Sequence, residues 1–178
     1  EIESDEYIKG PDKFPLDQNR WGYLPVPIAS FLQIDSKECQ VSATNTNLKP
    51  NHVCLLRHGV EVDPERSFIA CIADLYADRT SDGRIPSITD MRRRLHDAVD
   101  LDTFVRLQNG NLITEFAPSF PIETVEVDKY SESNLYRSTN FDLAANLDAL
   151  KRAVTSSEAF RLFLLDPITA PSYTHLWD

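Results

Sequence analysis

The clearest pattern of apolar and polar positions in the chain follows Asp63-Pro64. Asp is a preferred N-cap residue and Pro is favoured at the first helical position, so this pair predicts the start of a helix. Beyond it, large side chains fall at helical spacing on one broad apolar face. These side chains belong to Phe68, Ile69, Ile72 and Tyr76. We expect a buried helix from about Asp63 to Ala77 to be the central element of the core.

The part of the chain that precedes this helix is rich in residues that interrupt helices and strands. Residues 1–20 contain Gly and Pro breakers, which predict an irregular lead-in. Trp21 to Pro25 has the composition of an aromatic turn, and Pro27 to Leu32 predicts a short helix with Pro in its first turn. Residues 36–50 are rich in Ser, Thr and Asn, which predicts a surface loop.

Helical spacing continues after residue 86. Ser87 and Asp90 form a capping pattern that predicts a helix over 88–99. Another helix is expected to begin near Asp100 and to stop at Asn109-Gly110, where Gly permits a left-handed exit.

The remaining residues divide into a short β stretch and a helical end. Residues 112–127 show partial alternation that Pro118 and Pro121 interrupt, which predicts one or two short edge strands. A helical pattern follows from Asn140 and closes at Asp166-Pro167, and a last helix is expected to start within residues 173–177.

These elements predict an α+β fold that is mostly helical, with a small β component and a loop-rich N-terminal half. The length of 178 residues fits a single domain. Within it we expect an irregular lead-in (1–20), a mixed part (21–127) and a helical part (128–178). A large aromatic residue, Trp177, stands one position from the end, which predicts that the chain is a fragment of a longer protein.

Composition and charge narrow the classes of function. Hydrophobic residues make up 42% and charged residues 26% of the chain, a balance typical of a globular protein. The net charge of −10 argues against this chain gripping a nucleic-acid backbone by itself, since such surfaces are built from Lys and Arg. The three cysteines, Cys39, Cys54 and Cys71, are odd in number, so we expect reduced thiols in an intracellular compartment and no disulfide.

The sequence does not predict a metal, cofactor or nucleotide site. His52, Cys54 and His58 lie close together, and Cys71 and His96 could meet in space, but zinc would require a second matched pair of ligands. The carboxylates fall in loops or at helix starts, where capping explains them. The five glycines match neither the phosphate-loop spacing GxxxxGK nor the dinucleotide-binding spacing GxGxxG.

The only basic run is Arg92-Arg93-Arg94. On a helix these side chains fan out over about 200°, so they cannot all contact one phosphate strand. We expect a solvated face with acidic neighbours, and contact with a protein or nucleic-acid partner is the alternative for Arg92, Arg93 and Arg94.

The run Ser67 to Ala73, SFIACIA, resembles the helix that carries the nucleophile in ovarian-tumour-type and papain-like cysteine peptidases. Those enzymes place Cys at the helix start, where the N-terminus stabilises a thiolate, whereas this chain has Ser67 there. We expect Cys71 to lie on the buried side of the helix as an inert thiol. The resemblance therefore implies an inactive or degenerate peptidase-like domain, which an ordered His–carboxylate pair facing Ser67 or Cys71 in an open cleft would contradict.

A longer resemblance involves five short sequence segments spread over most of the chain. They are RWGYLP (20–25), CLLRHGV (54–60), SFIACIADLY (67–76), QNGNL (108–112) and YTHLWD (173–178). Together they resemble a region in large proteins of nucleocytoplasmic large DNA viruses that are similar to the large subunit of the poxvirus early transcription factor.

This second resemblance implies a role in transcription initiation. In that family the large subunit pairs with a small helicase-like subunit, recognises early promoters, helps to recruit the viral RNA polymerase and is packaged in virions. We expect a non-catalytic protein-interaction domain, present in the virion and in the cytoplasm of the host cell. DNA contact would then belong to other parts of the full-length protein. No membrane association is expected.

Overall fold

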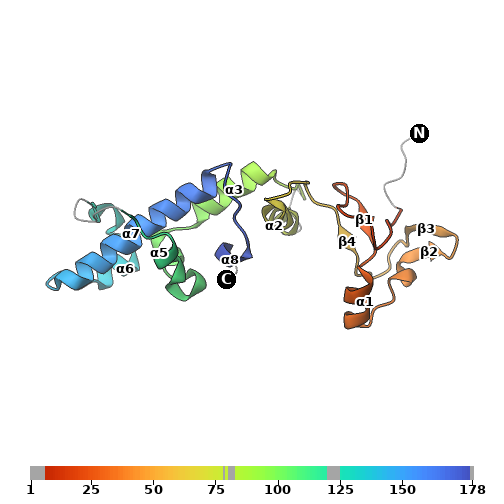
Figure 1. The fold of residues 1–178 in the computed structure, drawn as a ribbon, viewed down its shortest axis with the longest axis horizontal. Helices are drawn as coiled ribbons and strands as arrows, with labels where there is room; N and C mark the ends of the chain where they lie inside the picture. The colour runs from red at the N-terminus through yellow and green to blue at the C-terminus, as the bar shows by residue number, and fades with distance from the viewer. Residues whose placement is uncertain (1–6, 78, 80–82, 120–124, 177–178) are drawn as a thin grey trace.

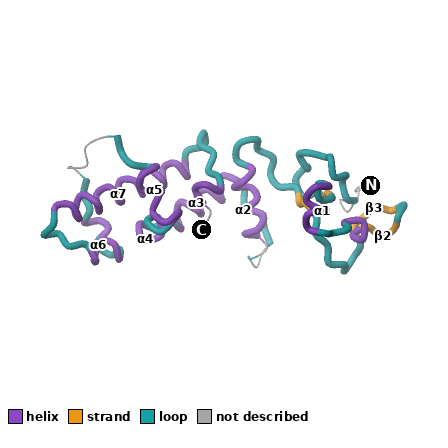
Figure 2. Tube along the Cα trace, turned by 60° about the horizontal axis from the view of Figure 1, so that its bottom comes forward, coloured by secondary structure: helices purple, strands orange, loops and turns teal. Residues whose placement is uncertain are grey.

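The computed structural model describes residues 7–77, 79, 83–119 and 125–176. The molecule is elongated and has two parts along its long axis (Figure 1). We call residues 7–60 the N-terminal lobe and residues 61–176 the helical part. The turned view separates the same two parts, with the strands confined to the lobe (Figure 2).

The N-terminal lobe is built from short elements on a small core. They are β1 (Trp21–Gly22), α1 (Val26–Leu32), the 3-10 helix η1 (Ser36–Cys39), β2 (Gln40–Ser42), β3 (Asn45–Leu48) and β4 (Arg57–His58). β1 pairs with β4 and β2 pairs with β3, both antiparallel. The buried apolar residues of the lobe are Ile8, Leu16 and Cys39.

Arg57 compensates for this small core with hydrogen bonds to the backbone. Its Nε donates to the Tyr23 carbonyl at 2.6 Å, and its two Nη atoms donate to the carbonyls of Lys13 and Gly10, each at 3.0 Å. The guanidinium therefore joins β4 to the irregular segment that precedes β1. Nearby, Gly59 packs so closely on Asp17 that a Cβ atom would collide with the Asp17 carbonyl.

A disulfide between Cys39 and Cys54 crosses the lobe, with their Cα atoms 5.6 Å apart. The prediction of three reduced thiols is therefore wrong for two of them. The sequence argument failed because it treated an odd cysteine count as evidence against any pair. Cys71 remains as the free thiol.

The helical part contains the longer helices. Its elements are α2 (Ser67–Ala77), α3 (Ile88–Ala98), α4 (Leu101–Phe104), η2 (Leu107–Gly110), α5 (Asn111–Glu115), η3 (Asp128–Tyr130), α6 (Asn134–Ser138), α7 (Ala144–Leu165) and α8 (Tyr173–Leu176). The fold is thus mostly helical with a small β component, as the sequence predicts. The first of these helices, α2, begins at Ser67.

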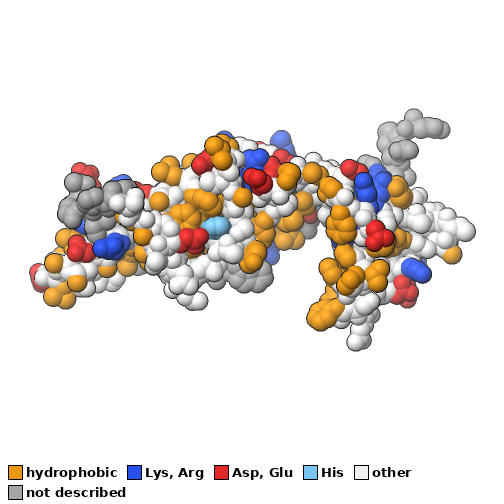
Figure 3. Space-filling model, in the orientation of Figure 1, with side chains coloured by type: hydrophobic (Ala, Val, Ile, Leu, Met, Phe, Trp, Pro, Cys, Tyr) orange, Lys and Arg blue, Asp and Glu red, His pale blue; other side chains and the backbone are white. Residues whose placement is uncertain are grey.

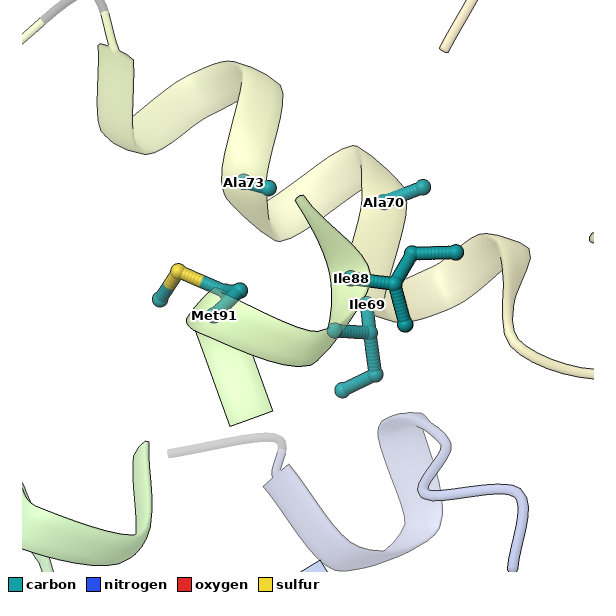
Figure 4. Packing of buried hydrophobic residues seen from close by; sticks show 5 residues of the cluster. All are labelled: Ile69, Ala70, Ala73, Ile88 and Met91. Carbon is teal, nitrogen blue, oxygen red and sulfur yellow. The ribbon is translucent and has the colours of Figure 1, made fainter. Parts of the chain in front are cut away.

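The core of the helical part has three neighbouring clusters. The first joins α2 to α3 through Ile69, Ala70, Ala73, Ile88 and Met91 (Figure 4). The small alanines allow close approach of the two helices. The other clusters pack α7 against α4 and α5, and Phe104 and Phe160 are fully buried there. α3 also packs along α7.

Two predictions about the central helix need correction. Asp63 caps a turn by accepting hydrogen bonds from the amides of Glu65 and Arg66, and regular helix begins only at Ser67. Cys71 is exposed, not buried, because the face that packs on α3 runs through Ile69, Ala70 and Ala73.

The structure also differs from the predictions for residues 36–50 and for the described part of residues 112–127. Residues 36–50 form η1 and the β2–β3 hairpin in place of a surface loop. Residues 112–119 and 125–127 contain no strand in the structure, and Asn111–Glu115 form α5. The remaining residues of that stretch, 120–124, lie outside the described residues. The predicted helices at 27–32, 88–99 and 140–165 are confirmed as α1, α3 and α7, within a few residues at their ends.

Candidate functional site

A groove of about 800 Å³ lies in the N-terminal lobe. One wall is α1 with the residues that lead into it, and the other is η1 with the start of the β2–β3 hairpin. We call it the α1 groove. Its lining residues are Pro11, Tyr23, Leu24, Val26, Ala29, Ser30, Gln33, Ile34, Asp35, Ser36, Lys37, Gln40 and Ala43.

α1 forms the apolar wall, and none of its residues is buried. Its large apolar side chains face solvent, and Phe31 is 85% and Val26 63% exposed. Ile28 and Leu32 are exposed as well. Figure 3 shows hydrophobic side chains over the lower part of the lobe, where α1 lies. The sequence predicted this helix but not that it lacks a partner within the chain.

Local sequence explains why α1 forms without a core to support it. Pro25 and Pro27 fix the backbone at its start, and Gln33 ends it in a left-handed conformation with φ of 56°. The Gln33 amide donates to the Ser30 carbonyl, which closes the last turn. The helix is therefore defined at both ends while its apolar face stays open.

The opposite wall of the groove is polar. Asp35 caps η1 by accepting a hydrogen bond from the Lys37 amide at 2.9 Å. The Tyr23 hydroxyl donates to Gln40 Oε1 at 2.6 Å, and burial raises the pKa of this phenol. Ser36 is only 9% exposed, and its hydroxyl has no hydrogen-bond partner in the described part of the chain.

The charge of the lobe differs from that of the whole chain. Residues 7–60 carry six basic side chains and four acidic ones, namely Lys9, Lys13, Arg20, Lys37, Lys49 and Arg57 against Asp12, Asp17, Asp35 and Glu38. Residues 61–178 carry twelve Lys and Arg against twenty Asp and Glu. Residues 1–6 add four acidic side chains and no basic one, so residues 1–60 carry a net charge of −2 and residues 61–178 one of −8.

The predicted basic run does not form one surface. Arg92 is only 4% exposed and donates to carbonyls at the C-terminal end of α7, including Leu164 at 2.6 Å and Phe163 at 2.8 Å. It is therefore unavailable to a partner. Burial, together with the nearby positive charge of Arg66, lowers its pKa.

The other two arginines remain on the surface. Arg93 is exposed and pairs with Asp90 one turn earlier, and Arg94 donates to the Tyr76 hydroxyl at 3.1 Å. The partner contact predicted for three arginines is reduced to these two, because the fan of consecutive helical positions turns Arg92 into the core.

The residues of the peptidase-like alternative are only partly brought together. His58 Nδ1 lies 2.9 Å from an Asp74 carboxylate oxygen, and its ring stacks on Trp21 with centroids 4.5 Å apart. Asp74 stands one helical turn after Cys71. Within the described residues no hydrogen bond joins His58 to Cys71 or to Ser67.

The electrostatics at Cys71 oppose a thiolate. Partial burial raises the pKa of the Cys71 thiol, and the negative charge of Asp74 raises it further. Neither His58 nor Asp74 lines the α1 groove. The negative charge of Asp74 disfavours the Cys71 thiolate, so the thiol is less nucleophilic.

The other candidate ligands are dispersed. Cys54 is bonded to Cys39, His96 pairs with its neighbour Asp97 at 2.8 Å, and His52 is exposed. No cluster of three or more metal-ligating side chains occurs among the described residues. In the same part of the chain, no helix has both the length and the apolar character to cross a membrane.

Comparison of the chain with known protein families, curated proteins and solved structures finds no match.

Proposed function

We propose that this protein is a non-catalytic protein-interaction domain whose contact surface is the exposed face of α1. The observation that carries this is the absence of any buried residue in a helix that displays Phe31 and Val26 to solvent. Phe31 shares a helical face with Ile28 and Leu32, at i, i+3 and i+4, and all three are exposed. An apolar face on a folded domain marks an interaction site, because leaving it in water is unfavourable.

The proposed setting is a viral early transcription factor. It rests on the resemblance of the chain to the large subunit of that factor. The direct partners would be the small helicase-like subunit or the viral RNA polymerase, and DNA would be contacted by other parts of the full-length protein. Of the two proposed locations, the virion suits the Cys39–Cys54 disulfide better than the host cytoplasm, since disulfides persist on virions but are reduced in the cytosol.

The state of Cys71 favours a non-catalytic domain over the peptidase-like alternative. A cysteine nucleophile needs a lowered thiol pKa, whereas the pKa of Cys71 is raised by burial and by Asp74. Ser67 at the helix start has no base within hydrogen-bonding distance among the described residues. Serine would need such a base.

Site-specific photo-crosslinking in infected cells tests the proposal. The full-length protein would carry benzoylphenylalanine in place of Phe31, and a matched control would carry it in place of Phe141, an exposed aromatic residue of the helical part. We expect adducts with the small subunit or the RNA polymerase from position 31 only. Equal adducts from both positions, or none from position 31, would contradict the proposed surface.

A further inference from the structure

We propose that the Cys39–Cys54 disulfide is a redox switch for the α1 groove. The oxidised bond holds the two walls of the groove together, and reduction by a thiol such as glutathione releases them. The inference concerns the order of the lobe and goes beyond the proposed contact surface. It draws on the position of the bond, on the lack of other directed contacts around Cys54, and on the access of a thiol to that residue.

The bond joins the two sides of the lobe that form the groove. Cys39 ends η1 and directly precedes β2, so it belongs to the wall that contains η1. Cys54 lies three residues before β4, which pairs with β1, the strand that leads into α1 on the opposite wall. The two strand pairs form separate sheets. The disulfide is therefore a covalent tie between the two walls.

The segment that carries Cys54 has no other directed contact. In the described part of the chain, residues 50–56 make no hydrogen bond, ion pair or ring contact, and they form no helix or strand. Such contacts resume on either side, at Lys49, whose amide donates to the Cys39 carbonyl at 2.8 Å, and at Arg57. Reduction thus leaves residues 50–56 attached through the chain alone.

The contacts that remain between the two sides after reduction are weak. The Ile8 amide donates to the Thr46 carbonyl at 2.9 Å, and the Tyr23 hydroxyl donates to Gln40. Three apolar residues of the described lobe are buried, and Cys39 is one of them, so a hydrophobic core cannot replace the bond. Because a disulfide restricts the opened chain, its loss favours states in which the walls separate.

A thiol can reach the bond from the Cys54 side. Cys39 is 3% exposed, whereas Cys54 is partly buried and follows Val53, which is 96% exposed. A glutathione thiolate attacks the Cys54 sulfur, and the Cys39 sulfur leaves as a thiolate and takes up a proton. A second glutathione thiolate then displaces the Cys54 sulfur. The cysteines gain two electrons and two protons from two glutathione molecules, which become one glutathione disulfide.

Reduction of the whole chain in glutathione buffers tests the inference. Every protein would carry Cys71→Ser, so that the third thiol cannot exchange with the pair. Alkylation and mass spectrometry would read the state of Cys39 and Cys54, and hydrogen exchange would be measured on the same samples. Cys54→Ser serves as a permanently open form, because this position is partly exposed and can accept a hydroxyl.

We expect reduced glutathione to break the bond in the folded protein, and glutathione disulfide to restore it. Amides of residues 26–48 should exchange at least about tenfold faster after reduction, since losing a cross-link over a loop of this length favours open states. Cys54→Ser should match the reduced parent. Amides of α3 and α7 should keep their rates, because the helical part has its own hydrophobic clusters.

Three results would overturn the inference. They are a bond that stays intact in excess reduced glutathione, exchange in residues 26–48 that reduction leaves unchanged, and equally faster exchange throughout α3 and α7, which would mean that the whole molecule unfolds. The outcome is separate from that of photo-crosslinking. If crosslinks from position 31 are absent but the walls respond to reduction, the switch stands and the contact surface fails. The reverse result leaves the contact surface without the switch.

Discussion

At the scale of single residues, two arginines show how this chain ends its longest helix. The carbonyls at the C-terminal end of α7 have no partners within the helix, and they lie where a positive charge is favoured. Arg92 binds four residues around this end, and Arg66 donates to the Pro167 carbonyl at 2.7 Å just beyond it. An arginine from a basic run on a helix can therefore be buried and stabilise the end of another helix.

Arg92→Ala should destabilise the protein markedly. The change removes the charged donor from the buried Leu164 carbonyl and from the carbonyls of Phe163, Asp166 and Thr169. We expect the free energy of unfolding to fall by roughly 3 kcal/mol, given the strength of hydrogen bonds to charged groups. Arg93→Ala is the matched control, since Arg93 is exposed and makes only a long contact with Asp90. Urea denaturation followed by circular dichroism measures both. Similar losses for the two variants would show that the α7 cap is not a source of stability.

Cys71 should react slowly although it is exposed. Because burial and the charge of Asp74 raise its pKa, little thiolate exists near neutral pH, and alkylation should accelerate only above the ordinary thiol range. Asp74→Asn removes the negative charge, so the thiol pKa should fall and the rate at fixed pH should rise. Iodoacetamide kinetics across pH would be followed by mass spectrometry. A slower reaction in Asp74→Asn or in His58→Ala would instead indicate an activated thiol and favour the peptidase-like alternative.

At the scale of elements, the sequence was informative wherever a helix carries its own signals. Ser87 accepts a hydrogen bond from the Asp90 amide at 3.1 Å, which is the capping pattern expected at the start of α3. Asp100 likewise caps α4 by accepting from the Thr103 amide at 2.7 Å. These interactions are local, so residue types a few positions apart determine them without help from the rest of the chain.

The elements that the sequence missed depend on distant contacts. The β2–β3 hairpin contains Ser, Thr and Asn, which favour turns, and its register is supported by the bridge between Tyr7 and Asn47 and by the Cys39–Cys54 bond. Contacts between residues far apart in the sequence leave no periodic pattern of apolar positions, so the hairpin could not be predicted from such a pattern. The α1 groove was missed for the same reason, because one of its walls is the segment that had been predicted to be a surface loop.

Ile69→Ala tests α2 as a core element. Ile69 has no exposed surface and packs between α2 and α3, so we expect a loss of about 2–5 kcal/mol in the free energy of unfolding, the usual range for such core truncations. The sequence had also predicted Ile72 as a buried position, but Ile72 is only partly buried. Leu75→Ala, at an exposed position of the same helix, is the control and should melt as the parent does. An equal effect of both changes would make the helix peripheral.

At the scale of the whole molecule, charge is divided between the two parts. Residues 1–60 carry a net charge of −2 and residues 61–178 one of −8. Neither presents the dense basic surface that releases counterions from DNA. We therefore expect the chain to show no tight binding to duplex DNA at physiological ionic strength, measured by anisotropy of a labelled duplex over a range of salt. A tight, salt-dependent complex would contradict this, and loss of that complex on changing Arg93 and Arg94 would identify its site.

The two parts should also differ in what holds them together. The lobe buries few apolar residues and is crossed by the Cys39–Cys54 bond, whereas the helical part has three hydrophobic clusters. The two cysteines are 15 residues apart. In the chain-entropy account, a disulfide that closes a loop of this length adds about 3 kcal/mol to the free energy of unfolding. Cys54→Ser should therefore lower the unfolding midpoint of the lobe and leave that of the helical part nearly unchanged.

The chain provides a separate probe for each part. With Trp177 replaced by Phe in every protein, Trp21 is the remaining tryptophan, so its fluorescence follows the lobe. Helical circular dichroism mainly follows α2 to α8, which contain most of the helical residues. Cys71→Ser, which leaves the bond intact, is the control. In the Cys54→Ser protein the fluorescence transition should precede the helical one. Coincident transitions would show that the lobe and the helical part unfold as one cooperative unit, joined through β4, His58 and Asp74.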